Sequence, residues 1–426
     1  MDLSSSWLSR LPDPLRRGLQ RTELGLALAL AAVIVLAMIL DTQHNYWHNP
    51  RDSGVEILRQ TAMLGIFALG AAIVIIAGGI DLSSGSVISL SGSVCATLML
   101  LLAPQEMRFN KPLGLGVITL AIFGTLIVGL LVGSLHAWLI TVVELPPFVA
   151  TLASLVGLRS LARALVGYFN EGRSQISIFD ERFRYLATSV WIPVILLIVL
   201  SLLAWLTLSR TVTGRHLYAL GGNENAARLS GIQTNRLKWL AYCISALLSS
   251  VAGVLYAGAG AAASPETVGK GYELNAIAAA VVGGCSLQGG VGTIPGTVLG
   301  CLFLRCVIDG VAKIIKTSAD IYEGVIVGGV VVVAVAFTQL RRARRRGKRF
   351  FPGSLGIVSI LALSMLIGVL AMLFGQKLAW GGNAVGGIAG LAALLFLSLA
   401  WFFEQRRERQ QGVRASAALP ARKQDN

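Results

Sequence analysis

The sequence predicts an all-α polytopic membrane protein with about ten core transmembrane helices, two discontinuous glycine-rich segments and two extra C-terminal helices. Hydrophobic residues make up 55% of the 426 residues and charged residues only 13%, whereas soluble domains carry about a quarter charged residues. The mean hydropathy is +0.72. Apolar runs of the roughly 20 residues that a membrane-spanning helix needs recur along the whole chain.

The apolar runs divide the chain into segments. Arg16, Arg17 and Arg21 precede the first run, and no small-residue cleavage site follows it, so we expect this run to remain as the first span. The expected segments are a cytoplasmic N-terminal segment (1–21), a transmembrane core (22–340) with a polar insertion (211–238), a basic linker (341–353), a two-helix hairpin (354–403) and a cytoplasmic tail (404–426). The candidate spans lie near 22–40, 57–77, 84–103, 113–141, 147–167, 190–208, 239–260, 273–288, 291–308, 321–338, 355–374 and 384–403.

The distribution of basic residues predicts the orientation. If the N-terminus is cytoplasmic and the spans alternate, the inside segments carry about twice as many Lys and Arg residues as the outside loops, which is the positive-inside bias. Both termini are therefore expected in the cytoplasm. The basic run 341–349 is expected to lie against anionic headgroups of the lipid bilayer. The net charge of +15 then needs no nucleic acid as a partner.

No pattern for catalysis, metal binding or nucleotide binding stands out. All five cysteines fall in or near apolar runs, and none forms a CxxC pair. His44 and His48 are four residues apart, but they lie in a loop beside Tyr46 and Trp47, which is typical of a membrane interface. No Gly-x-x-x-x-Gly-Lys-(Ser/Thr) motif occurs. The sequence therefore predicts no cofactor, no metal site and no enzymatic activity of its own.

The polar insertion 211–238 contains the pattern of a short capped helix. Asn223 is a good N-cap residue, Gly231 suits the left-handed position after a helix end, and Glu224 and Arg228 are spaced as a helical ion pair. We expect a helix of about two turns over 221–232, which either docks a soluble partner or is an ordinary connecting loop. The expected docking residues are Gly221, Gly222, Asn223, Glu224, Ala226, Ala227, Arg228 and Gly231.

Two glycine-rich breaks separate apolar runs, one at 78–85 and one at 283–290. Both fit the pattern Gly-Gly-x-(Asp/Ser)-Leu-x-(Ser/Gly)-Gly, which we interpret as a trace of internal duplication. Backbone that leaves a helix inside a membrane must be buried in protein or line a watery cavity, and paired interruptions point to a translocation path. The expected path residues are Gly78, Gly79, Asp81, Ser83, Gly85, Gly283, Gly284, Ser286, Gly289 and Gly290.

Charged residues interrupt the apolar runs at three places. Asp81 either faces a cavity in the path or caps the start of the third span, with Ser83, Ser84 and Ser86 as hydrogen-bond donors. Arg159 and Arg163 share a helix face and are expected to meet Glu144 or to extend toward the interface. The pair Arg305 and Asp309, four residues apart, is expected to form an intrahelical ion pair.

Taken together, the stretches 77–87, 221–232 and 271–290 resemble the membrane permease subunit of bacterial ABC sugar importers, the ribose/xylose/galactose group of the branched-chain amino acid permease superfamily. The opening of the fifth span, 147–152, is also similar. The resemblance covers roughly residues 20–340, and the stretch Gly-Gly-Asn-Glu…Ala-Ala-Arg-Leu-Ser-Gly-Ile carries it most specifically.

The resemblance implies several partners and a location. It implies a separate ATP-binding ABC subunit that docks on 221–232, an extracytoplasmic sugar-binding protein, a second permease subunit in a homodimer, and the bacterial inner membrane. Loops 168–189 and 261–272 are candidates for contact with the sugar-binding protein. A monosaccharide would then pass through this chain, and ATP would be hydrolysed on the partner.

Two features depart from the family's pattern. The hairpin 354–403 follows the point where such permeases usually end, and Cys285 and Gln288 stand where small or hydroxyl residues are more usual. The identity of the sugar therefore does not carry over. The competing hypothesis is a proton-coupled secondary transporter of a small polar solute that uses Asp81 as its proton carrier.

Overall fold

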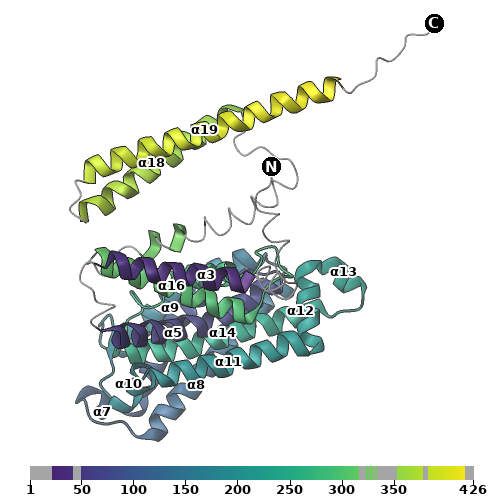
Figure 1. The fold of residues 1–426 in the computed structure, drawn as a ribbon. Helices are drawn as coiled ribbons and strands as arrows, with labels where there is room; N and C mark the ends of the chain where they lie inside the picture. Colours follow the sequence, from purple (N-terminus) through teal and green to yellow (C-terminus); the bar gives the residue numbers. More distant parts are fainter. Residues whose placement is uncertain are drawn as a thin grey trace. The chain divides into compact units, whose positions relative to one another are not determined.

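Long apolar helices dominate the computed structural model of the chain (Figure 1). The structure describes residues 22–41, 49–315, 323–325, 327–329, 332, 353–377 and 382–417. It divides into unit 1, residues 1–334, and unit 2, residues 335–426, and each is considered by itself. The predicted N-terminal segment 1–21, nearly all of the basic linker and most of the candidate span 321–338 lie outside the described residues.

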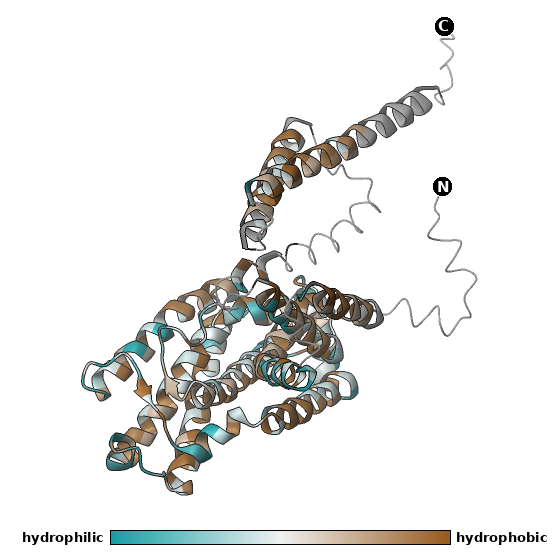
Figure 2. Ribbon diagram, turned by 60° about the vertical axis from the view of Figure 1, so that its left-hand side comes forward, coloured by the Kyte–Doolittle hydropathy of each residue, from teal (hydrophilic) through white to brown (hydrophobic). Residues whose placement is uncertain are grey.

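The predicted fold class, an all-α multi-pass membrane protein, is confirmed. Within the described residues, eight helices are long and apolar enough to cross a membrane. Figure 2 shows apolar residues along these helices, with hydrophilic residues concentrated in the connecting segments. The helices of unit 1 are α3 (Thr22–Leu40), α5 (Pro50–Ile76), α6 (Ser84–Leu102), α7 (Pro104–Arg108), α8 (Leu115–Thr141), α9 (Pro147–Phe169), α10 (Glu181–Thr188), α11 (Trp191–Arg210), α12 (Val212–Gly222), α13 (Glu224–Leu229), α14 (Thr234–Ala259), α15 (Tyr272–Val282) and α16 (Ile294–Ile315).

Helix α5 forms the centre of unit 1. Its apolar window is 89% buried, whereas that of α11 is only 17% buried and leaves most of its side chains for lipid. Neighbouring helices approach closely because α5 carries glycine: a Cβ atom at Gly70 would lie 2.7 Å from the Cα atom of Ser245 in α14. Helices α14, α15 and α16 also pack against α5. The 27 residues of α5 span about 40 Å at 1.5 Å per residue, so this helix connects the two ends of the unit.

The two ends of unit 1 differ. In Figure 1 the short helix α13 lies at one end, while α7 and α10 lie at the other. At the α10 end, strands β1 (Ile176–Ser177) and β2 (Ala262–Ala263) pair in antiparallel orientation. This pairing joins the two loops that the sequence marks as candidates for an external partner.

One predicted span is wrong. The sequence suggests a span at 273–288, but α15 contains 11 residues. It is therefore about 16 Å long, roughly half of what a bilayer core requires. The chain leaves the helix at Gly283, and the glycine-rich break 283–290 follows. Helix α15 is thus a half-helix that ends inside the protein.

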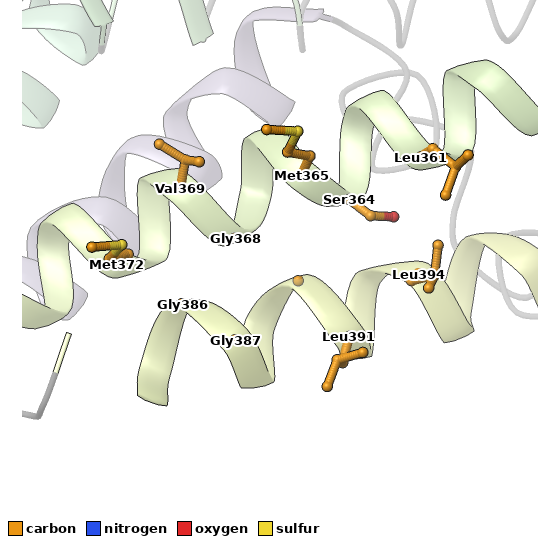
Figure 3. A pocket seen from close by; sticks show the side chains of 11 residues that line it. Leu361, Ser364, Met365, Gly368, Val369, Met372, Gly386, Gly387, Leu391 and Leu394 are labelled. Atoms are coloured by element: carbon orange, nitrogen blue, oxygen red, sulfur yellow. The ribbon is translucent and has the colours of Figure 1, made fainter. Parts of the chain in front are cut away.

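Unit 2 consists of a hairpin of α18 (Gly353–Lys377) and α19 (Gly382–Ala417). The two helices pack through glycine: a Cβ atom at Gly368 would lie 3.1 Å from the carbonyl oxygen of Gly386 and 3.3 Å from the Cα atom of Gly390. Figure 3 shows this contact, beside which Leu361, Met365 and other apolar side chains line a shallow pocket. Both predicted runs form helices. Of the two, only α19 contains, within the described residues, a stretch long and apolar enough to span a membrane, Gly382–Phe402, while the apolar part of α18 is the shorter Gly356–Val369. Helix α19 continues to Ala417, beyond the predicted end at residue 403.

Candidate functional site

Helices α12 and α13 form a polar stub, which we define as residues 211–232. The side chain of Thr211 caps α12 by accepting a hydrogen bond from the amide of Gly214 at 3.1 Å. The side chain of Asn223 caps α13 by accepting from the amide of Ala226 at 3.0 Å. The predicted N-cap is therefore confirmed, and it satisfies one of the free amides at the helix start.

The C-terminal end of α13 is also as predicted. Gly231 has φ +81°, the left-handed conformation that favours glycine. The amide of Ile232 donates to the carbonyl of Ala227 at 3.1 Å, and the amide of Gly231 donates to that of Arg228 at 3.0 Å. These two bonds form a Schellman motif. Two caps fix this helix of six residues, which would be too short to persist by propensity alone.

Charges also hold the polar stub in place. The Glu224 carboxylate accepts from the Arg228 guanidinium at 3.0 Å, as predicted, and from Lys238 Nζ at 2.7 Å. Burial by itself raises the pKa of Glu224, but the hydrogen bonds and charges of Lys238 and Arg228 lower it below its ordinary value. Lys238 belongs to α14, so this pair fastens α13 to a long helix. The outer face remains uncovered, since Leu229 is 89% exposed.

The polar stub is in direct backbone contact with both glycine-rich breaks, at a place we call the glycine junction: Gly78, Gly221, Gly289 and Gly290. The amide of Gly290 donates to the carbonyl of Ile76, at the end of α5, at 2.9 Å. A Cβ atom at Gly221 would overlap that same carbonyl oxygen and would lie 2.5 Å from the Gly290 nitrogen. Three stretches far apart in the sequence therefore meet where no side chain fits between them.

Backbone conformation gives a second reason for glycine in the glycine junction. Gly78, Gly289 and Gly290 have φ values of +85°, +84° and +70°, and other residues rarely adopt these values. A Cβ atom at Gly289 would also lie 2.5 Å from the Gly221 carbonyl oxygen. Close backbone approach at this point depends on glycine in all three stretches.

The other predicted path residues lie elsewhere. Gly85 packs against the backbone of Gly269, and Gly283 packs against that of Gly296. Gly79 faces the Tyr242 hydroxyl, which would lie 2.5 Å from an added Cβ atom. Gly284, with φ +100°, and Ser286 belong to the turn before the glycine junction. There the amide of Gly289 donates to the Ser286 carbonyl at 2.8 Å. Of the predicted path residues, the structure therefore brings Gly78, Gly289 and Gly290 together in the glycine junction. The others lie outside it, in neighbouring turns and helix contacts.

Asp81 is buried in the turn before α6, and it bonds Ser83, the N-cap residue of that helix. One carboxylate oxygen accepts from the amide of Ser83 at 2.8 Å and from its hydroxyl at 2.6 Å. The other accepts from the hydroxyl of Ser245 in α14 at 2.7 Å. Ser86 donates instead to the carbonyls of Ser83 and Ser154. The carboxylate thus ties the turn before α6 to α14, which is a structural role.

A cavity of about 340 Å³ lies between the polar stub and the glycine junction. Its walls combine the glycines with the polar groups of the stub and of α14. They include Gly78, Gly79, Gly221, Gly222, Asn223, Glu224, Lys238, Tyr242 and Gln288. Groups predicted to dock a partner and groups predicted to line a path thus share one cavity.

The structure differs from one of the two alternatives for Arg159 and from the predicted ion pair of Arg305. Arg159 does not meet Glu144 in the described contacts; its guanidinium donates to the carbonyls of Pro265, Val268 and Gly269, at 2.8–3.2 Å. Asp309 pairs with Lys313 at 2.8 Å. Arg305 instead lies 3.6 Å from Glu323. Spacing along one helix did not predict the partners of Arg159 and Arg305, because these lie outside their own helices. Asp309 does pair within α16, but with the residue four positions later and not with the one four positions earlier.

The profile of one protein family matches residues 54–335, and its description is the permease component of branched-chain amino acid transport systems. The ribose import permease protein RbsC of Haemophilus influenzae is 33% identical over 282 residues, 65% of this chain and 81% of that protein. RbsC of Escherichia coli K12 is 33% identical over 314 residues, 72% of this chain and 91% of its own length.

The xylose transport system permease protein XylH of Escherichia coli K12 is 29% identical over 378 residues, 75% of this chain and 92% of that protein. No solved structure matches the chain at a significant level. The family match covers unit 1 from α5 onward and therefore includes the polar stub and both glycine-rich breaks.

Proposed function

Because this chain belongs to the family of permease components of branched-chain amino acid transport systems, we propose that it is the membrane subunit of an ATP-driven importer for a monosaccharide. The sugar class is supported by relatives named as ribose and xylose permeases. The observation that carries the proposal is the glycine junction, because it joins an exposed polar stub to the two breaks in the apolar core.

The energy source in this proposal is a separate ATPase subunit. The chain has no phosphate-binding loop of its own. Its polar stub offers a capped helix with an exposed apolar tip at Leu229 and a charged flank at Arg228. These features suit docking into a groove on a soluble partner. The chain itself is non-catalytic in this scheme.

The transport mechanism is alternating access. When the ATPase closes, it moves α13, and the ion pair of Glu224 with Lys238 passes the movement to α14. The backbone contacts of Gly221 pass it to the ends of α5 and of the second break. The path then opens to one side or the other as a helix pair moves around this point.

The complete assembly in this proposal contains two copies of the permease, the ATPase and an external sugar-binding protein. The chain lies in the bacterial inner membrane with both termini and the polar stub in the cytoplasm. The β1–β2 end, at the opposite end of unit 1, would then face the external protein. Sugar specificity would depend largely on that partner.

A charge reversal tests the proposed docking. The double variant Glu224→Lys with Arg228→Glu keeps the pair but inverts it, and it places a lysine next to Lys238. We expect loss of co-purification with the ATPase and loss of ATP-driven sugar uptake. The matched control for co-purification is Arg108→Glu with Glu171→Arg, which inverts an exposed 2.7 Å ion pair at the other end of unit 1 and should leave association with the ATPase unchanged. Normal association and uptake in the first variant would refute the docking role of the polar stub.

A further inference from the structure

A second cavity, which we call the outer cavity, lies near the β1–β2 end of unit 1, far from the polar stub. It has a volume of about 450 Å³, within the range of roughly 300–1,000 Å³ that is typical of small-molecule sites. Glu56 in its wall precedes the end of α5 by 20 residues, so about 30 Å of helix separates it from the glycine junction. Arg59, also in the wall, donates to the carbonyl of Ala187 in α10 at 3.4 Å.

Hydrogen-bonding side chains from four helices converge on this outer cavity. On α5, the Glu56 carboxylate accepts from Arg59 at 2.7 Å and from the Gln60 amide at 2.8 Å. On the opposite wall, Arg305 of α16 lies 3.6 Å from Glu323, a loose ion pair. The polar wall residues are Glu56, Arg59, Gln60, Tyr256, Tyr272, Arg305, Asp309 and Glu323.

Two buried polar atoms of this wall have no hydrogen-bond partner among the described residues other than each other's side chain. They are the hydroxyl of Tyr256, in a residue that is 8% exposed, and Nε of Arg305. They belong to neighbouring side chains of α14 and α16. Buried polar groups gain from further hydrogen-bond partners, so a polar occupant of the cavity that pairs with them would be stabilised.

Two tyrosine rings, Tyr256 and Tyr272, belong to the wall. Tyr272 stacks on Phe67 with 6.1 Å between ring centroids and 12° between ring planes. The ring centroid of Tyr256 lies 4.8 Å from that of Tyr272. The cavity therefore combines a flat apolar surface with a ring of donors and acceptors. This combination suits a sugar, whose C–H groups pack on an aromatic face while its hydroxyls pair with carboxylates and guanidinium groups.

The charges of the wall favour an uncharged occupant. Two guanidinium groups face three carboxylates, and one of these, Asp309, also pairs with Lys313 at 2.8 Å. Positive and negative groups therefore balance, so an anion or a cation would meet repulsion as well as attraction. We propose that this outer cavity is a binding subsite for a neutral, polyhydroxylated molecule of monosaccharide size. The inference rests on the proposed function, and it means that the permease itself contains a site that binds the sugar before transport.

Ligand binding by the full-length permease in lipid nanodiscs tests the subsite. The probes are D-ribose and D-xylose, and saturation-transfer NMR measures their binding. Wild-type protein is expected to show saturable binding. Tyr272→Ala, which removes the stacking surface, and Arg305→Gln, which removes a charged donor, are each expected to weaken binding about tenfold or more. The matched control Tyr168→Ala removes an 82% exposed tyrosine outside the cavity and should leave binding unchanged.

Two further variants keep the test decisive if a large truncation unfolds the protein. Tyr272→Phe retains the ring, and Glu56→Gln retains the shape of the side chain. Both are expected to remain folded and to weaken binding by several-fold. Absence of saturable binding to the wild-type protein, or equal binding by the cavity variants and Tyr168→Ala, would overturn the subsite.

ATP-driven uptake by the complete importer, measured in parallel, separates this proposal from the proposed function. Sugar uptake that all cavity variants retain at the wild-type rate would overturn the subsite alone. Absence of sugar uptake by the wild-type importer would remove the proposed function, while the nanodisc measurement would still decide the cavity.

Discussion

At the scale of single residues, the sequence predicted what depends on local chemistry. Asn223 and Gly231 cap α13 as expected, because a cap involves only residues a few positions away. It missed partners that another helix supplies. Ser245 donates to Asp81 from 164 residues away, and no spacing rule links a serine in an apolar run to a distant carboxylate.

The glycines show the same limit. The Gly-Gly pattern predicted breaks in the apolar runs at 78–85 and 283–290. It did not predict that Gly221 of the polar stub contacts both breaks. Helix propensity is the same for Gly221 and Gly222, which are neighbours at the end of α12, so it does not distinguish them. Only the three-dimensional contacts distinguish a glycine that is packed on backbone from one that is open.

Gly221→Ala is expected to impair folding and transport. The added methyl group would overlap the Ile76 carbonyl and lie 3.0 Å from the Gly78 nitrogen, and backbone atoms yield less readily than side chains. Overpacking of this kind costs about 1–3 kcal/mol. The temperature of thermal unfolding of the purified protein and the rate of sugar uptake by the importer should both decrease.

Gly222→Ala provides the matched control for this prediction. It adds the same methyl group one residue later, where nothing lies within 4 Å. Since alanine is a better helix former than glycine, this variant should unfold at the wild-type temperature or slightly above it. Equal behaviour of the two variants would show that the glycine junction tolerates a side chain and would remove its part in the mechanism.

At the scale of elements, hydropathy and length predicted most spans. The runs near 84–103 and 190–208 correspond to α6 and α11 within a few residues. The wrong prediction at 273–288 has a physical cause. A half-helix that is buried by protein is as apolar as a full span, so composition does not reveal where it stops. The helical start of the polar insertion, α12, was likewise hidden in a segment that reads as a connection.

The stability of the polar stub should depend on pH through Glu224. Because Lys238 and Arg228 lower the pKa of this carboxyl in the folded protein, its ionised form stabilises the stub at pH values above the pKa of an unfolded Glu, about 4.3. That stabilisation is lost as the pH falls through the lower, folded value. Hydrogen exchange of the α13 amides, corrected for the intrinsic rate, should therefore show constant protection between about pH 6 and 8 and weaker protection below about pH 4.

Glu224→Gln is the control for this pH dependence. The amide keeps the size of the side chain but does not titrate, so protection of α13 should be lower at neutral pH and nearly independent of pH. A variant that loses protection at acid pH to the same extent as the wild type would show that another group is responsible.

At the scale of the whole molecule, the chain combines two units with different relations to the family. Unit 1 ends at residue 334, and the family match ends at residue 335. Unit 2 has its own glycine-packed interface between α18 and α19, so each unit contains the contacts that stabilise its helices. The polar stub, the glycine junction and both cavities consist of unit 1 residues.

This division predicts that the C-terminal hairpin is dispensable for transport. A chain that ends after residue 350 keeps unit 1 and the basic run 341–349, which should still hold its end at the lipid headgroups. We expect normal membrane insertion, normal co-purification with the ATPase and sugar uptake close to that of the full chain. Uptake in cells, normalised to the amount of permease in the membrane, measures this. Full insertion combined with lost uptake would mean that unit 2 takes part in the transport cycle. The double variant Gly368→Leu with Gly386→Leu, which forces α18 and α19 apart in the intact chain, would then separate the two possible reasons, since it should reproduce the loss only if the packed hairpin itself is required.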